Sequence, residues 1–258
     1  MGIRGRGIFY LAAGLLLSAC TYEQEGPPSL HFTHFKAVAP QNDTVTVCSA
    51  YGCQHQTLFT FTARDIRKMG ILMEESHREN TPEAERKALA KTIAWIEKRV
   101  GGVTGTERDR AGLDLLGSGD RRQQDCVDEA TNTTSYMMVM ERHGMLRHHK
   151  VLRPMAKGNM IMGIWPHWGA MIEERATGRK FAVDSFFHAN GEPPVIMAAE
   201  RWYIDEGGTS TPMVAKAQPM AVPPPGQILA RGKLDALLEQ MAARPPEGAR
   251  PAAFGYGK

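Results

Sequence analysis

A cysteine, a histidine and an aspartate follow one another in an order that suits nucleophilic catalysis. Cys126 comes directly after a stretch rich in Gly, Asp and Arg, and His167 and Asp184 follow in two strand-like segments. A thiolate is a strong nucleophile, but it needs a base that accepts and returns a proton and a group that fixes the tautomer of that base. The sequence therefore predicts Cys126 as nucleophile, His167 as base and acid, and Asp184 as the orienting carboxylate.

The position of Cys126 at the start of a predicted helix supports this role. The helix is expected over 126–142, with Gly144 suited to a left-handed C-cap. A thiol at a helix start lies at the positive end of the helix dipole, beside unpaired N–H groups that favour a thiolate and can hold an oxyanion. Asp128 and Glu129 suit the dipole but partly offset the stabilisation of the thiolate.

A predicted hairpin brings the other two residues together. His167 begins a segment, 167–174, and Asp184 lies in the next one, 180–187, with an Ala-Thr-Gly-Arg turn between them. Antiparallel pairing places His167 near the second half of the partner strand. The imidazole is therefore expected beside the carboxylate, with the start of the helix packed against the same sheet.

These residues and their contexts resemble the transglutaminase-like core, a papain-like α+β fold found in transglutaminases, peptidases and amidases. The resemblance extends over about residues 60–205 and is strongest over 124–187. It implies helices packed on an antiparallel sheet and a cysteine hydrolase that attacks an amide or peptide bond through a thioester, without a cofactor. Transfer to an amine in place of water stays open.

The resemblance also implies a side-chain donor for the oxyanion just upstream of the nucleophile. Gln124 or Gln123 is the candidate, at a shorter spacing than in papain-like enzymes. The chain departs from the family in reading Gln-Asp-Cys, ending at Cys126, where many members have Gly-x-Cys.

Each of these residues also has a purely structural interpretation. Cys126 is then a buried thiol, His167 a core histidine beside Trp168, and Asp184 a turn or surface acid. His188 is the rival base, although it follows the later segment. The alternative to an enzyme is therefore a catalytically inactive domain that serves as a binding or scaffolding module in the cell envelope.

The N-terminus has the features of a bacterial export signal. Arg4 and Arg6 precede an apolar run over 8–17, which is too short for an ordinary transmembrane helix. The Leu-Ser-Ala-Cys sequence that ends at Cys20 resembles a lipobox, which implies acylation of Cys20 and a lipid anchor. Thr21 in place of Asp favours the outer membrane, facing the periplasm; a plain cleaved signal peptide is the alternative.

The remaining chain divides by composition. Residues 1–20 are the expected signal, 21–42 a polar tether, 43–205 the transglutaminase-like domain, and 206–258 a Pro- and Ala-rich tail with one helix at 232–243. Within the domain we expect two strands in 43–62, a helix at 63–78, a helix from Thr81-Pro82 that stops at Gly101-Gly102, and a strand at 147–153.

Cys48 and Cys53 are the remaining cysteines, and in an oxidising compartment they are the natural disulfide pair. Reduced thiols, or a metal shared with His55, are the alternatives. His148 and His149 are neighbours, so in a strand they point to opposite faces and no metal site is expected there.

The charge of the chain does not favour a polyanionic partner. The formal net charge is +3 and is spread along the chain, without a basic stripe interleaved with aromatics. The expected partners are therefore a peptide or protein substrate of the cell envelope and the membrane itself, through the anchor, and not nucleic acid.

Overall fold

The computed structural model describes residues 26–113, 115–159 and 164–204, which form an α+β unit with two antiparallel sheets. The elements in chain order are α1 (Ser29–His34), β1 (Thr44–Ser49), β2 (His55–Thr60), α2 (Ala63–Glu79), α3 (Pro82–Thr104), the 3₁₀ turns η1 (Thr106–Arg108) and η2 (Leu115–Gly117), α4 (Cys126–Arg142), β3 (His149–Asn159), β4 (Ile164–Glu174), β5 (Lys180–Asp184), β6 (Val195–Ala198) and α5 (Ala199–Ile204). The expected signal, Cys20, and the helix at 232–243 lie outside the described residues.

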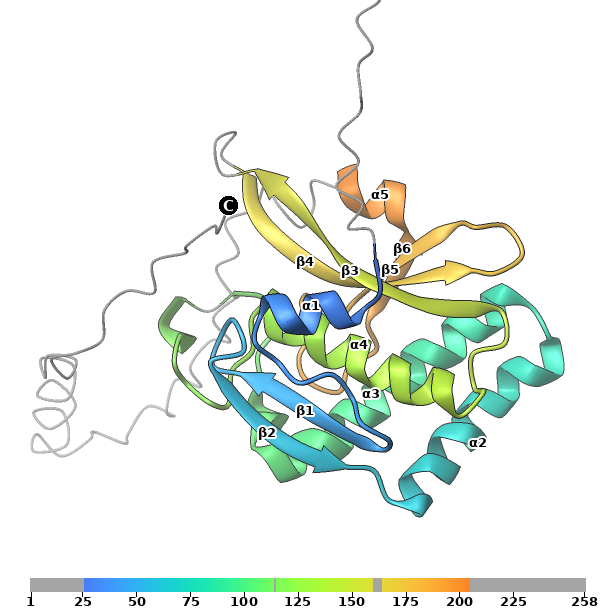
Figure 1. Ribbon diagram of the computed structural model, residues 1–258, viewed down its shortest axis with the longest axis horizontal. Coiled ribbons are helices and arrows are strands. Elements are labelled where there is room, and N and C mark those ends of the chain that lie inside the picture. Colours follow the sequence, from blue (N-terminus) through green and yellow to red (C-terminus); the bar gives the residue numbers. More distant parts are fainter. Residues whose placement is uncertain (1–25, 114, 160–163, 205–258) are drawn as a thin grey trace, which may run out of the picture. The chain divides into compact units, whose positions relative to one another are not determined.

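Helix α4 is the centre of this unit. It packs against β1 on one side and against β3 and β4 on the other, so it lies between the two sheets (Figure 1). Most of its residues are buried, including polar Thr131, Asn132 and Thr134. Its first residue is Cys126, as the sequence predicts, and Gly144 follows its end with a left-handed φ of 68°.

Helix α3 is longer than the sequence predicts. Thr81 caps its start through the Ala84 N–H and Pro82 is its first residue, as expected. The predicted stop at Gly101 and Gly102 is wrong, because the helix continues to Thr104. Gly101 serves close packing instead: a Cβ there would lie 2.9 Å from the Glu107 backbone nitrogen.

The larger sheet has the strand order β3-β4-β5-β6, and all its pairs are antiparallel. Strands β4 and β5 form the expected hairpin, in the register Ala170 to Val183. Strand β5 ends at Asp184, earlier than predicted, because the chain turns there and the Phe186 N–H donates to the Asp184 carboxylate. Strand β6 and helix α5 were not predicted.

Part of the segment expected as a tether, 21–42, is a packed helix. Helix α1 lies over α4 in Figure 1, and its Phe32 is 1% exposed. The buried side chains His31 and Phe32 supply the reason, since six residues gain helical stability only from tertiary packing.

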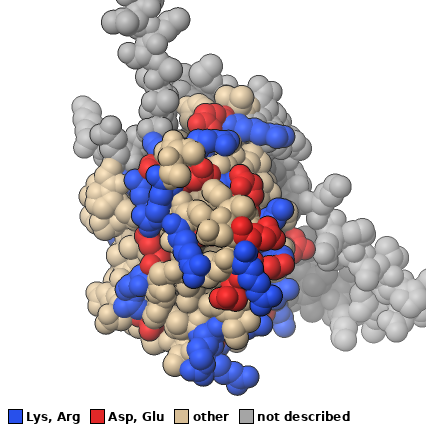
Figure 2. All heavy atoms as spheres, turned by 90° about the vertical axis from the view of Figure 1, so that its right-hand side faces the viewer, with Lys and Arg blue, Asp and Glu red and all other residues tan. Residues whose placement is uncertain are grey.

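The described surface carries both signs of charge. On the face in Figure 2, Lys and Arg side chains alternate with Asp and Glu. Among the described residues, helices are too short or too polar to cross a bilayer.

Candidate active site

His167 and Asp184 form a buried hydrogen-bonded pair. The His167 Nε2 atom lies 2.7 Å from Asp184 Oδ2, and the His167 side chain is fully buried. Burial acts to raise the pKa of Asp184, but the His167 ring, the Trp202 N–H and the charge of Lys157 together lower it below its usual value. The ionised carboxylate can only accept, so Nε2 carries the ring hydrogen.

The other ring nitrogen of His167 has no hydrogen-bond partner among the described residues. Its Nδ1 is buried and makes no hydrogen bond to the described part of the chain. In the tautomer that Asp184 selects, this atom is a lone-pair acceptor. Such a nitrogen is what a general base requires.

Trp202 is a member of this site that no pattern in the sequence predicts. Its indole N–H donates to the same Asp184 Oδ2 at 2.7 Å, and its ring lies 5.7 Å from the His167 ring. Gly169 makes room for it, because a Cβ there would lie 2.8 Å from Trp202 Cζ2. Lys157 donates to the Trp202 carbonyl at 2.8 Å and thereby holds α5 against the sheet. Only contacts between distant segments reveal this role.

Cys126 lies against the backbone that follows His167. The Trp168 N–H is directed at its sulfur, and the Asp184 charge acts on it. The thiol is also covered, since Cys126 is 8% exposed. Its apolar neighbours are Val127, Phe186, Phe35, Leu113, Trp168 and Phe187.

The electrostatics at this thiol differ from the expectation. Burial, the charge of Asp125, and those of Asp184 and Asp128 raise the pKa of Cys126 well above its usual value, and the Trp168 N–H opposes this only in part. The helix start was expected to favour a thiolate; in this closed site the thiol holds its proton. Removal of that proton therefore depends on a base.

A disulfide-closed loop holds the start of α4. Cys48 and Cys53 are bonded, and Cys126 is the free cysteine of the described chain. Residues 50–53 all have φ between 58° and 71°, so their N–H groups converge. Those of Tyr51 and Cys53 donate to Asp128, and that of Gly52 donates to Asp125. Asp125 and Asp128 also form the capping box of α4.

The two glutamines expected as oxyanion donors are used elsewhere. Gln123 Nε2 donates to the carbonyls of Arg108 and Arg122, and Gln124 Nε2 donates to that of Cys48 at 3.2 Å. These bonds anchor the loop that precedes α4, and they leave the side-chain donor role without support.

The other candidates also have structural positions. His188 Nδ1 lies 3.6 Å from the Glu192 carboxylate. Within the described ranges, Cys48, Cys53 and Asp128 are the grouped ligand types, but the disulfide uses both sulfurs and backbone N–H groups occupy the carboxylate. This group does not fit a metal ion.

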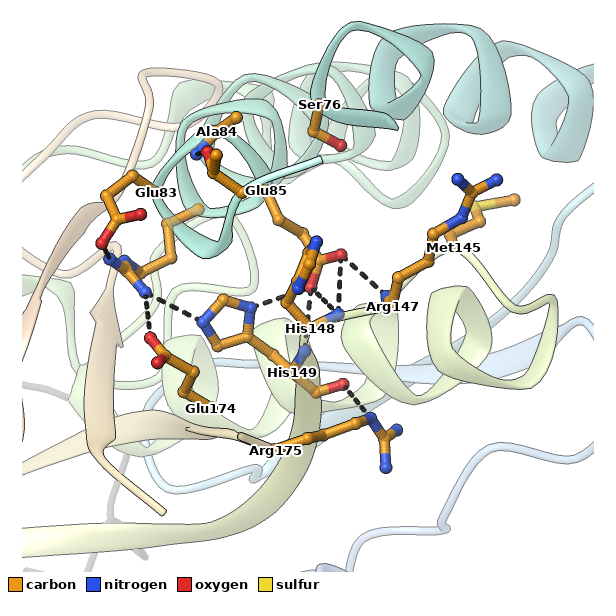
Figure 3. A network of polar contacts seen from close by, with 12 residues as sticks. Ser76, Glu83, Ala84, Glu85, Met145, Arg147, His148, His149, Glu174 and Arg175 are labelled. Atoms are coloured by element: carbon orange, nitrogen blue, oxygen red, sulfur yellow. Dashed lines mark hydrogen bonds and ion pairs between the residues drawn. The ribbon is translucent and has the colours of Figure 1, made fainter. Parts of the chain in front are cut away.

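A second buried histidine–carboxylate pair lies at the other end of β3 and β4, where His149 pairs with Glu174 in the strand register. His149 Nδ1 is 2.8 Å from Glu85, and its Nε2 is 3.1 Å from Arg86 Nη1 (Figure 3). Glu85 also accepts the backbone N–H groups of Arg147, His148 and His149. Both ring nitrogens are therefore engaged.

Comparison of the chain with models of known protein families, with curated proteins and with solved structures finds no match.

Proposed function

We propose that this chain is a transglutaminase-like cysteine hydrolase that cleaves an amide or peptide bond through a thioester on Cys126. The observation that carries the proposal is the state of His167. One ring nitrogen is held by Asp184, and the other makes no hydrogen bond within the described part of the chain; the next residue is Trp168, whose amide contacts the thiol. The order and contexts of Cys126, His167 and Asp184 supply the family resemblance.

The acylation step follows from these groups. His167 Nδ1 takes the proton of the Cys126 thiol as the sulfur attacks the carbonyl carbon of the substrate. The resulting imidazolium is stabilised by ionised Asp184. It returns the proton to the departing amine nitrogen as the C–N bond breaks, which leaves an acyl thioester on the sulfur.

Water completes the cycle. His167 takes a proton from water, the hydroxyl adds to the thioester carbonyl, and the sulfur leaves with the proton that His167 returns. The products are a carboxylic acid and the free thiol. A primary amine in place of water would give transamidation, so the acceptor decides between hydrolysis and cross-linking.

The backbone is the better candidate for oxyanion stabilisation. The Asp125 carboxylate accepts from the amides of Val127 and Asp128, at 3.1 and 3.0 Å. The Cys126 amide is the first-turn donor that it does not use, and it adjoins the reacting sulfur. We assign it to the developing oxyanion, in place of Gln123 and Gln124.

The resemblance of residues 17–20 to a lipobox supports an envelope location for this enzyme, with an anchor at acylated Cys20 and periplasmic peptides or proteins as substrates. The second candidate is an inactive binding module with the same fold. The burial of Cys126 and its raised pKa favour that alternative, because a covered, protonated thiol is inert until the site opens.

The experiment compares envelope proteins from cells that produce the full chain, Cys126→Ala or His167→Gln. Mass spectrometry of labelled N-termini should find new ends only with the parent chain. Incorporation of a fluorescent primary amine, tested in parallel, distinguishes transfer from hydrolysis. Identical N-termini and equal amine incorporation in all three samples would contradict the proposal and favour the binding module.

A further inference from the structure

The N-terminal segment, 29–35, covers the thiol of the candidate site. Phe35 follows α1 and packs on the apolar cluster around Cys126. Its ring lies 5.1 Å from that of Trp168, edge to face, and His34 adds a second contact at 6.2 Å. A substrate carbonyl therefore cannot reach the sulfur from this side while the segment is in place.

His31 fixes this segment to the body. It is fully buried, with its ring 5.2 Å from that of Trp168 and its Nε2 atom 2.8 Å from Thr131 Oγ1 on α4. The Thr131 hydroxyl donates its own hydrogen to the Val127 carbonyl at 2.6 Å. His31 Nε2 must then be the donor, so Nδ1 is a bare acceptor.

That second nitrogen of His31 is buried and makes no hydrogen bond within the described ranges. A proton on it would be a buried cationic N–H without an acceptor, which is costly. The docked segment therefore requires a neutral ring at His31.

The rest of the segment is lightly held. Helix α1 has six residues, its N-cap Pro28 makes no side-chain cap, and Leu30 on it is 44% exposed. A helix this short has little stability of its own, so its place depends on the contacts of His31, Phe32 and Phe35. Loss of one anchor should release the segment as a unit.

We propose that residues 29–35 are a lid over Cys126, closed while His31 is neutral and opened by acidification. Its role as a regulator of catalysis rests on the function proposed above, whereas its covering of the thiol does not. Opening exposes the sulfur, Trp168 and the face of α4 beside them to an incoming peptide.

The charges that face His31 agree with this direction. Arg153 from β3 and His34 from its own helix are the charged or titratable neighbours, while α4 and β4 present neutral Thr131 and Trp168. Burial first, then Arg153 and His34, lower the pKa of His31 to about 3. A released histidine has its ordinary pKa of 6.5. The closed form is thus favoured above pH 6.5. Below it, the equilibrium constant for closing falls about tenfold per pH unit.

The test measures how fast iodoacetamide alkylates Cys126 in the full chain with its disulfide intact. Trypsin releases residues 123–142 as one peptide with a single cysteine, so mass spectrometry reads this thiol alone. At pH 7.5, Phe35→Ala should accelerate labelling at least tenfold, while Leu30→Ala, an exposed site on the same helix, should stay within twofold. Equal rates in the two variants would overturn the lid. Circular dichroism checks that both are folded.

A second variant tests the pH dependence without removing an aromatic anchor. His31→Phe keeps the contact with Trp168 but cannot titrate. The ratio of the parent rate to the His31→Phe rate should rise about tenfold per pH unit below 6.5 until the lid is fully open, because ionisation of Cys126 cancels in the ratio. A ratio that is flat between pH 7.5 and 5 would overturn the pH gate.

His167→Gln separates this proposal from the proposed function. Slower labelling in His167→Gln with no effect of Phe35→Ala would retain the base and eliminate the lid. Acceleration by Phe35→Ala with no effect of His167→Gln would retain the lid and eliminate the catalytic pair.

Discussion

Two buried histidine–carboxylate pairs lie at opposite ends of the β3–β4 ribbon, and they differ in what surrounds the ring. His149 uses Nδ1 toward Glu85 and Nε2 toward Arg86, whereas His167 uses Nε2 toward Asp184 and its Nδ1 has no partner in the described ranges. The distances within the pairs are nearly equal, 2.8 and 2.7 Å. Burial and a short hydrogen bond are therefore insufficient to identify a base; the informative feature is the unpartnered nitrogen.

The two carboxylates differ in the same sense. Burial acts to raise the pKa of Glu85, but His149 and the backbone N–H groups of His148 and Arg147 lower it, so this carboxylate satisfies a turn as well as a ring. Asp184 receives its strongest donors from His167 and Trp202, two side chains. The Glu85–His149 pair therefore stabilises the fold, whereas the contacts of Asp184 hold the His167 ring in position.

The largest expected effect is on reactivity at the second pair. Asp184→Ala removes the carboxylate that accepts from both His167 and Trp202. The His167 ring then has no group that fixes its tautomer and no negative charge to stabilise its protonated form. The turnover rate, or the His167-dependent part of Cys126 alkylation, should fall roughly 10³-fold. A folded Asp184→Ala protein with near-parental rates would remove Asp184 from the mechanism.

Glu85→Ala tests the first pair in the opposite way. It leaves three backbone N–H groups and His149 without their acceptor, so the free energy of unfolding should fall by about 3–5 kcal/mol. The alkylation rate per folded molecule should not change. Urea unfolding measures the loss, and Glu85→Gln, which keeps one acceptor, should lose less. A specific fall in Cys126 reactivity in the folded variant would break the contrast.

Trp202→Phe examines the support behind Asp184. It removes one donor to a buried carboxylate, which is worth about 1.5–3 kcal/mol, and should slow the His167-dependent reaction about tenfold. Trp95→Phe is the matched control, since Trp95 is a half-buried side chain that packs on the core. Equal rates in the two variants would make Trp202 a packing residue only.

The smallest expected effect concerns pH. Burial is the main reason that the pKa of Glu97, whose carboxylate accepts from the Ser185 hydroxyl, is raised to about 7. Since its unfolded value is lower, near 4.5, its stabilising contribution is full below that pH and is lost as pH rises through 7. Glu97→Gln should reduce the loss of stability between pH 6 and 8 by about 1–2 kcal/mol. Parallel stability curves for parent and variant would contradict this assignment.

Local signals predicted the parts of the site that depend on local order. The Asp-Cys start of α4, the hairpin that brings His167 to Asp184, and the caps at Thr81 and Gly144 follow from capping and turn chemistry. The predicted stop at Gly101-Gly102 is wrong, and at Gly101 the small residue serves close packing against η1 instead of ending the helix.

The rest depends on contacts between distant segments. Trp202 reaches Asp184 from α5, His31 reaches α4 from the supposed tether, and the N–H groups of 50–53 reach Asp128. Hydrophobic periodicity does not encode such contacts. The sequence shows that Cys126 starts a helix, whose dipole lowers the pKa of a thiol. It does not show the burial of the thiol or the carboxylates around it, which raise that pKa.

We assign the activation of Cys126 to His167 and not to His149. The most direct measurement is the alkylation rate of Cys126 across pH 6–9 in the parent, His167→Gln and His149→Gln, each normalised to its folded fraction. We expect His167→Gln to be at least tenfold slower than the parent near pH 7 and to stay slower across this range, because the raised pKa of Cys126 keeps the thiol protonated without a base, while His149→Gln follows the parent throughout. Coincident profiles for the parent and His167→Gln would contradict it.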